Sequence, residues 1–252
     1  MFAVQSKANV VFIHVGVPLP EQMKIFTGLL EKYGFDKMNY KIIFREGDVG
    51  HMIWDVCKDE KVDLLISGAL RKEPVQKQNF GSIARGLAGS PEGNVLLLPE
   101  PQVPARPLAK IIIAVSDDNP DTVIETGIFF GNQTSLAQLY FVKESIFKVP
   151  PWTMLRYEND PEFRDAADLI IKEERDGITR RLADFTTSGL NVSSELVFGH
   201  PGLGIVNFAR EIGANLIIDS HPDAKTANPE YRYPHDVEVI LLNMPCNLLL
   251  FK

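Results

Sequence analysis

An internal repeat constrains the fold of this chain more than any other feature of its sequence. The matching positions are apolar runs typical of buried strands and glycines typical of turns: 10–15 with 137–142, Gly47 with Gly199, Ile53 with Ile205, 64–66 with 216–218, and 95–98 with 248–251. Self-similarity of this kind indicates that one folding unit occurs twice. Three prolines at Pro101, Pro104 and Pro107 predict a linker, which divides the chain into domains at 1–103 and 108–252.

Each copy alternates short apolar runs with longer amphipathic stretches, and this alternation predicts a parallel sheet covered by helices. In the first copy we expect strands at 10–15, 40–44, 64–67 and 95–98, and helices at 20–34, after Asp48, and at 83–87. In the second copy we expect strands at 110–115, 136–142, 192–197, 216–218 and 247–251, and helices at 121–130, 163–188 and 199–212. The fold class is therefore α/β, with two tandem doubly wound parallel-sheet domains.

Two helices of the first copy have apolar faces that we expect to be buried. The helix that opens at Pro20 should bury Met23, Phe26, Leu29, Leu30 and Tyr33, and the helix after Asp48 should bury Ile53, Val56 and Cys57.

The first copy lacks a counterpart of the strand at 110–115. Met1 aligns with Ile128, so the opening strand and most of the first helix are missing from this copy. An unfilled place in a parallel sheet leaves strand edges exposed, which is costly. The alternatives are a natural chain that starts earlier, a rearranged sheet, or a sheet completed by another chain. The edge argument favours the first of these.

The most informative motif lies between the strand at 64–67 and the apolar run at 95–98. Gly68 ends the strand, and Gly81 and Ser82 open the helix that follows the intervening loop. A glycine lets the backbone turn tightly, and a Gly-Ser pair at a helix start offers free N–H groups and a hydroxyl. Such a place suits a phosphate.

This spacing resembles the ATP-binding signature of the universal stress protein family, which is Gly-x-x-Gly, nine residues, then Gly-Ser or Gly-Thr. The resemblance implies an adenine nucleotide alpha hydrolase-like fold and an adenine nucleotide, ATP or AMP, held by Gly68, Arg71, Gly81, Ser82 and Ile83. Arg71 replaces the second glycine of the signature, so its side chain either crowds the phosphate or binds it. The missing opening strand would normally bring an aspartate to the nucleotide.

The second copy departs further from the signature. Its equivalent positions are Ser220, Asp223 and Tyr233-Pro234, and its first loop reads Ser116-Asp117-Asp118. Asp223 would repel a phosphate, and proline removes an N–H donor. We therefore expect no ATP at the usual site of this copy.

Other motifs have simpler interpretations. Residues 199–204 read Gly-His-Pro-Gly-Leu-Gly but lack the lysine of a phosphate-binding loop, and we interpret them as a turn into a helix. His221, His235, Asp219, Asp223 and Asp236 could converge on a metal, although solvated loop residues are the favoured interpretation. No serine lies in a nucleophile-elbow pattern, so we expect a binding protein rather than an enzyme. A weak ATP hydrolase stays open as a further alternative, although the sequence offers no general base that we can name.

The composition narrows the function further. A net charge of -7 argues against nucleic-acid binding, and no apolar run is long enough to insert into a membrane. Cys57 and Cys246 lack a CxxC neighbour, and free thiols packed in a reducing cytosol are expected. Together with the resemblance, this predicts a cytoplasmic protein.

Two functional hypotheses follow. The first is a stress-response protein with at most one nucleotide, bound in the first copy, that acts through partner proteins or through self-association as a dimer. In the family that the chain resembles, the last strands of two domains pair with each other, and the strands at 96–98 and 248–250 are placed to do so within one chain. The alternative is a scaffold without nucleotide, or a soluble regulatory domain of a larger protein such as a membrane transporter.

Overall fold

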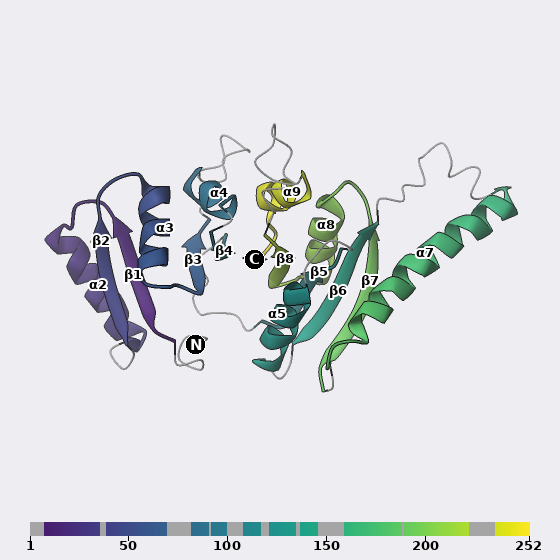
Figure 1. Ribbon diagram of the computed structural model, residues 1–252, viewed down its shortest axis with the longest axis horizontal. Helices are drawn as coiled ribbons and strands as arrows, with labels where there is room; N and C mark the ends of the chain where they lie inside the picture. The colour runs from purple at the N-terminus through teal and green to yellow at the C-terminus, as the bar shows by residue number, and fades with distance from the viewer. Residues whose placement is uncertain are drawn as a thin grey trace. The chain divides into compact units, whose positions relative to one another are not determined.

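The computed structural model describes the chain in ten stretches. They are residues 8–35, 39–69, 82–90, 92–99, 108–116, 121–134, 137–145, 159–187, 189–221 and 235–252. Strands and helices alternate through these ranges, as Figure 1 shows. The α/β class is therefore confirmed.

The first half contains every strand and helix that the sequence predicted within the described residues. They are β1 (Val10–Val15), α2 (Pro20–Lys32), β2 (Tyr40–Arg45), α3 (Val49–Asp59), β3 (Leu64–Gly68), α4 (Ser82–Ala88) and β4 (Asn94–Leu98). The predicted linker at 101–107 lies outside the described residues.

The second half is fuller. Its elements are β5 (Lys110–Ala114), α5 (Asp121–Asn132), β6 (Gln138–Ser145), α7 (Pro161–Leu182), β7 (Asn191–Phe198), α8 (Leu203–Ile212), β8 (Leu216–Ser220), α9 (His235–Asn243) and β9 (Asn247–Phe251). The sequence analysis did not predict α9, which occupies the place of α4 in the repeat.

One seven-stranded sheet runs through both halves in the order β3-β4-β9-β8-β5-β6-β7. All its neighbouring pairs are parallel except β4 and β9, which pair antiparallel with Leu96 opposite Leu249. The predicted pairing of the terminal strands within one chain is thus confirmed. Because β4 and β9 are each paired on both sides, self-association through these strands finds no open edge in this structure.

The opening strand of the first half is missing from the described residues, as the repeat predicted. In the second half, β5 lies between β8 and β6 and pairs in parallel with both. In the first half, β1 and β2 form a two-stranded sheet of their own, and β3 pairs with β4 on one side.

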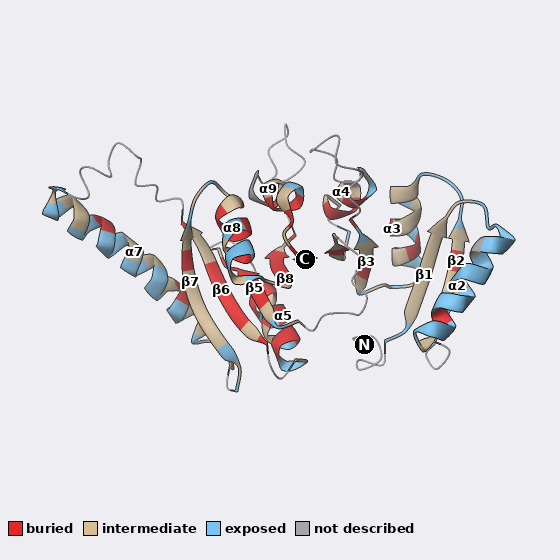
Figure 2. Ribbon diagram, turned by 180° about the vertical axis from the view of Figure 1, so that it is seen from behind, coloured by how far each residue is buried: buried red, intermediate tan, exposed pale blue. Residues whose placement is uncertain are grey.

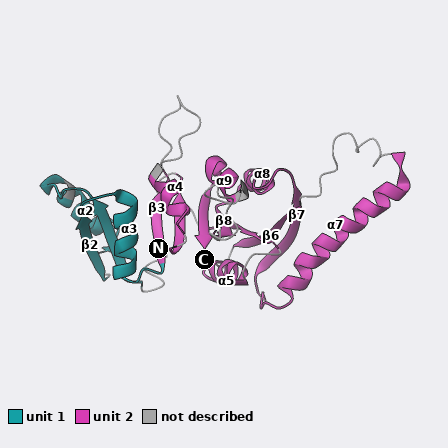
Figure 3. Ribbon diagram, turned by 45° about the horizontal axis from the view of Figure 1, so that its top comes forward, with its two compact units in different colours: residues 1–63 teal, residues 64–252 magenta. Residues whose placement is uncertain are grey.

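The chain contacts divide the protein at a different place from the repeat. Residues 1–63 form one compact unit and residues 64–252 form the other, as Figure 3 shows. The first unit holds β1, α2, β2 and α3, while β3, α4 and β4 belong to the second unit through the pairing of β4 with β9. The division into domains at 1–103 and 108–252 stays a prediction from the repeat.

The hydrophobic core is concentrated in the second half. Most residues of β5, β6 and β8 are buried (Figure 2), whereas every residue of β1 is half-buried. The main core cluster joins strand residues such as Ile113 and Ile218 to Val123 and Ile124 of α5 and Ile178 of α7. Successive aliphatic residues are buried here because helices cover both faces of the sheet.

The predicted apolar face of α2 is only partly buried. Leu30 is buried and Phe26 is half-buried, but Met23, Leu29 and Tyr33 are exposed. The prediction was wrong for these three residues because α2 covers a sheet of two strands, which is too narrow to bury the whole face of a helix.

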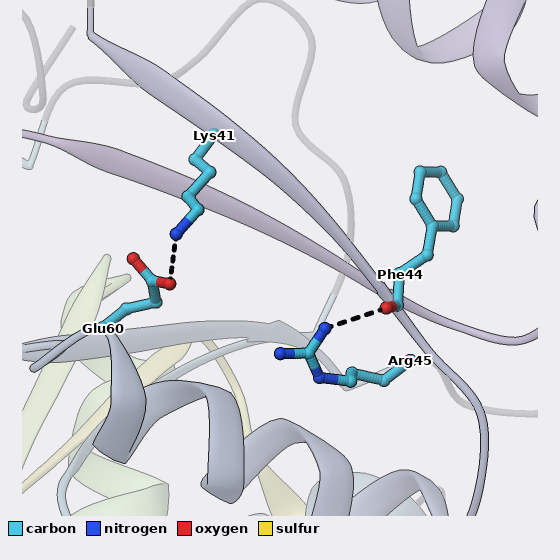
Figure 4. A network of polar contacts seen from close by, with 4 residues as sticks. All are labelled: Lys41, Phe44, Arg45 and Glu60. Atoms are coloured by element: carbon cyan, nitrogen blue, oxygen red, sulfur yellow. Dashed lines mark hydrogen bonds and ion pairs between the residues drawn. The ribbon is translucent and has the colours of Figure 1, made fainter.

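Local contacts explain where α3 begins and ends. The carboxylate of Asp48 accepts the N–H of His51 at 3.1 Å and caps the helix, as an N-terminal aspartate should. After the last residue of α3, Glu60 forms an ion pair with Lys41 of β2, and at the opposite end of β2 Arg45 donates to the carbonyl oxygen of Phe44 at 3.2 Å (Figure 4). Of the predicted inward residues, Val56 is buried, while Ile53 and Cys57 are half-buried.

Candidate functional site

The backbone at the end of β3 is open to approach. Gly68 is exposed, and a Cβ atom added there would meet nothing within 4 Å. The next residue, Ala69, is fully buried, and its N–H donates to the carbonyl oxygen of Leu98 at 2.8 Å. This hydrogen bond anchors the turn to β4 and leaves the glycine exposed.

The helix expected to face a phosphate begins where the sequence predicted. Helix α4 starts at Ser82 and packs against β4, and Ile83 in its first turn is 46% exposed. Gly68, Ser82 and Ile83 therefore lie in one unit, at the end of a strand and the start of the following helix. Arg71 and Gly81 lie outside the described residues, so their part in a site stays a prediction.

The same place in the second half carries a side chain, because Ser220 stands where the first half has Gly68. Asp219 is 7% exposed and His221 is 8% exposed at the end of β8. A carboxylate oxygen of Asp219 accepts the N–H of Ser220 at 2.7 Å, and the N–H of His221 donates to Phe251 at 2.6 Å. A buried carboxylate opposes a phosphate by charge and by volume.

These positions also correct one expectation about the metal-ligand candidates. Asp219 is buried within β8 and His221 is buried directly after it, so neither is solvated. Asp223, Tyr233 and Pro234 lie outside the described residues, and His235 and Asp236 open α9. Within the part of the chain that the structure describes, no group of acidic, histidine or cysteine side chains could hold a metal.

An arginine occupies the end of β5, and the sequence analysis missed it. Arg181 of α7 donates to the carbonyl oxygen of Ser116, just after β5, and forms an ion pair with Asp121 at 3.0 Å. This contact joins α7 to the start of α5. The sequence signal was weak, because Arg181 lies far from Ser116 along the chain.

The backbone of the glycine-rich turn at 199–204 binds a carboxylate side chain of the protein itself. Glu144, in β6, accepts the N–H groups of Gly202 and Gly204 at 2.5 and 2.7 Å. Gly202 has a φ of +80°, and a Cβ on Gly204 would lie 2.6 Å from the carboxylate, so both positions need glycine. The interpretation as a turn into a helix is confirmed, and Glu144 is the partner that sequence reasoning missed.

Both cysteines are free thiols, as expected. Cys57 is half-buried and Cys246 is buried. Burial raises the pKa of the Cys246 thiol to about 12, because the charged thiolate is poorly solvated there. Among the helices in the described ranges, none has the length and apolar character needed to cross a membrane.

Comparison with known proteins identifies the fold. No protein-family model matches the sequence, and no curated protein matches it. A protein of unknown function from Pseudomonas aeruginosa PAO1 is 16% identical, with a TM-score of 0.68 over 99% of this chain and 84% of that one. A universal stress protein from Archaeoglobus fulgidus DSM 4304 is 17% identical, with a TM-score of 0.66 over 97% of this chain and 86% of that one.

The chain has the fold of the universal stress proteins. Both structures match almost the whole chain, which confirms the resemblance inferred from the repeat and from the motif around Gly68. At this level of identity the likeness shows the universal stress fold alone. A universal stress protein solved in complex with cAMP matches 57% of the chain at a TM-score of 0.34, which is too weak a likeness to indicate a ligand.

Proposed function

We propose that this chain is a stress-response protein of the universal stress type that binds one adenine nucleotide, ATP or AMP, in its first half. The nucleotide would lie at the end of β3, held by Gly68, Arg71, Gly81, Ser82 and Ile83. The protein would act through a partner protein, because the sequence contains no pattern of nucleophile and base that we can assign to catalysis.

The observation that carries this proposal is the contrast between the ends of β3 and β8. Gly68 presents open backbone at the end of β3, and α4 begins in the same unit. At the end of β8, Ser220 takes the place of Gly68 and is half-buried, and the carboxylate of the buried Asp219 accepts its N–H. Open backbone at Gly68 supports a phosphate site in the first half, whereas the backbone N–H at the equivalent position of the second half already donates to a carboxylate.

The experiment is a thermal unfolding series with ATP and with AMP. A ligand at ten times its dissociation constant stabilises a protein by about 1.4 kcal/mol, which for a chain of this size raises Tm by about 3–6 °C. Gly68→Glu should abolish this rise, because the added side chain has room in the fold and places a negative charge where the phosphate would bind.

Gly28→Glu is the matched control for this series. Gly28 is exposed on α2 and a Cβ added there also meets nothing within 4 Å, so the variant makes the same change in charge away from the proposed site. It should keep the full nucleotide response. Absence of any rise in the unmodified protein at millimolar nucleotide would remove the proposal.

A second function is favoured by the strand edges of the first half. Neither β1 nor β3 has a described strand on its second side, so this half offers backbone for protein contacts. A scaffold without nucleotide, or a soluble regulatory domain of a larger protein such as a membrane transporter, would use these edges. A normal interaction with a partner in the Gly68→Glu variant, together with no nucleotide response, would support this alternative.

A further inference from the structure

The two compact units differ in how much apolar surface they bury. In residues 64–252, strands β5 and β8 each have one half-buried residue and are otherwise buried, and the main core cluster lies there. Among the described residues, no member of this cluster comes from residues 1–63. The buried apolar side chains that the structure describes in residues 1–63 are Leu30, Ile43, Trp54 and Val56. Because burial of apolar surface is the main favourable term in folding, the first unit gains less free energy per residue from it.

The packing of helices on their sheets differs in the same direction. In the second unit, a Cβ atom added to Gly127 of α5 would lie 2.3 Å from the side chain of Ile113 in β5, so this helix and its sheet are in close contact. In the first unit, Leu30 is the one described residue of α2 that is buried. Trp54 of α3 is buried too, but its indole N–H has no hydrogen-bond partner among the described residues, which lowers stability.

The size and the sheet of the first unit also limit its stability. A domain of about 60 residues buries a smaller share of its surface than a larger domain and is marginally stable. The first unit comprises residues 1–63, and the sheet that the structure describes there consists of β1 and β2, separate from the seven-stranded sheet. The ion pair between Lys41 and Glu60 joins side chains that are 58% and 24% exposed, and such pairs contribute little. The first unit should therefore unfold at a lower free energy than the second.

The elements of the first unit are joined to one another, so they should unfold together. The ring of His14 in β1 contacts Phe26 of α2 and Phe44 of β2, with ring centroids 6.3 and 5.6 Å apart. Helix α3 packs against β1, and Glu60 directly after it pairs with Lys41 of β2. Each of these elements therefore loses contacts within the unit when one of the others unfolds.

We infer that residues 1–63 unfold as one unit while residues 64–252 keep their fold. The separate sheet and the scarcity of buried apolar side chains in the first unit carry this inference. The chain thereby has a partly folded state of low free energy that retains the seven-stranded sheet, including Gly68 and Ser82 in the second unit. In this state, apolar residues such as Ile43 and the backbone of β1 and β2 become accessible to other molecules. The inference does not depend on nucleotide binding.

Native-state hydrogen exchange of the full chain in increasing urea tests the inference. Amides of β1 and β2 should be protected at least about 100-fold less than amides of β5 and β8. The urea dependence of their exchange should be about a quarter to a third of that in β5 and β8, because this dependence scales with the surface exposed and residues 1–63 are about a quarter of the chain. One urea dependence shared by all four strands would overturn the inference.

Two buried isoleucines give matched variants, one in each unit. Ile217 of β8 is 0% exposed, and Ile217→Ala should speed exchange in β8 at least about thirtyfold while leaving β1 and β2 unchanged, because their unfolding does not include β8. Ile43 of β2 is 7% exposed, and Ile43→Ala should speed exchange in β1 and β2 by a similar factor. Equal acceleration of β1, β2 and β8 by Ile217→Ala would contradict the inference. Ile217→Val repeats the comparison with a smaller loss.

The two cysteines give a second measurement, because one lies in each unit. Cys57 is half-buried in α3, and Cys246 is buried directly before β9. At a urea concentration where β1 and β2 have lost protection, a thiol reagent should label Cys57 at least about 100-fold faster than Cys246. The variants Cys57→Ala and Cys246→Ala assign the two rates. Equal labelling rates at this urea concentration would overturn the inference.

Discussion

The two halves of this protein contain the same unit in two different states of completion. In the second half, β5 lies inside the sheet and α5 covers it, and the aliphatic residues around them are buried. In the first half, β1 and β3, which are the counterparts of β6 and β8, belong to different sheets. A single strand with its helix thus decides whether the surrounding apolar residues form a core or a surface.

The two halves also differ in whether their backbone polar groups are already bonded within the protein. In the complete half, the carboxylate of Asp219 accepts the backbone N–H of Ser220 at the end of β8, and Glu144 accepts two N–H groups of the glycine-rich turn. The incomplete half leaves Gly68 exposed and β3 unpaired on one side among the described residues. Burial and self-satisfied polar groups favour a stable scaffold, whereas open backbone is what binding a ligand or partner requires.

The largest expected effect on stability comes from truncating Ile218 in β8, and it is compared with truncation of Ile66, which holds the equivalent position in β3. Ile218→Ala should lower the free energy of unfolding by about 2–5 kcal/mol, because it leaves a cavity in a closed core. Ile66→Ala should lower it by no more than about 1 kcal/mol, because most of this side chain is already in water. Urea unfolding of both variants gives the two values, and equal losses would contradict the difference in burial.

A smaller loss in the free energy of unfolding is expected when the carboxylate of Glu144 is removed. Glu144→Ala should cost about 1–3 kcal/mol, since it leaves the N–H groups of Gly202 and Gly204 without their acceptor. Glu144→Gln keeps one acceptor oxygen and should lose less. Glu125→Ala, on the exposed face of α5, matches the change in charge and should have little effect on the urea midpoint.

The smallest effect should come from removing the aspartate that caps α3. This helix is the first-half equivalent of α8. The N–H of His51, and then its side chain, lower the pKa of Asp48 below 3.8 by hydrogen bonding to the carboxylate. A lowered pKa means that the stabilisation is present above the ordinary pKa and is lost as pH falls through the folded one. Asp48→Ala should therefore be slightly less stable than the unmodified protein at neutral pH, with a difference that vanishes in acid.

The control for this pH dependence is Asp48→Asn, which can cap the helix without ionising. Its stability relative to Asp48→Ala should be the same at neutral pH and at about pH 3. Thermal unfolding across this range measures both differences. A gap between the unmodified protein and Asp48→Ala that widens in acid would contradict the assignment of Asp48 as a charged cap.

Much of the fold could be predicted because its signals are local. The apolar run at 10–15, the proline at Pro20 and the aspartate at Asp48 each act on neighbouring residues, and the structure has strands and helices there. The repeat extended this reasoning to the missing strand, and the resemblance to the universal stress proteins extended it to the pairing of β4 with β9. Gly68 and the start of α4 were placed correctly for the same reason.

The contacts made at long range could not be predicted in this way. Glu144 reaches the turn at Gly202, and Arg181 reaches Ser116, across large separations in sequence that no spacing rule describes. The exposure of Met23 and Tyr33 and the burial of Asp219 depend on how many strands and helices surround each residue. Sequence alone determined the order of the elements, because hydrophobic period and turn chemistry are properties of neighbouring residues. The tertiary structure decided which apolar residues became core, because burial depends on how many elements distant in the chain pack around each residue.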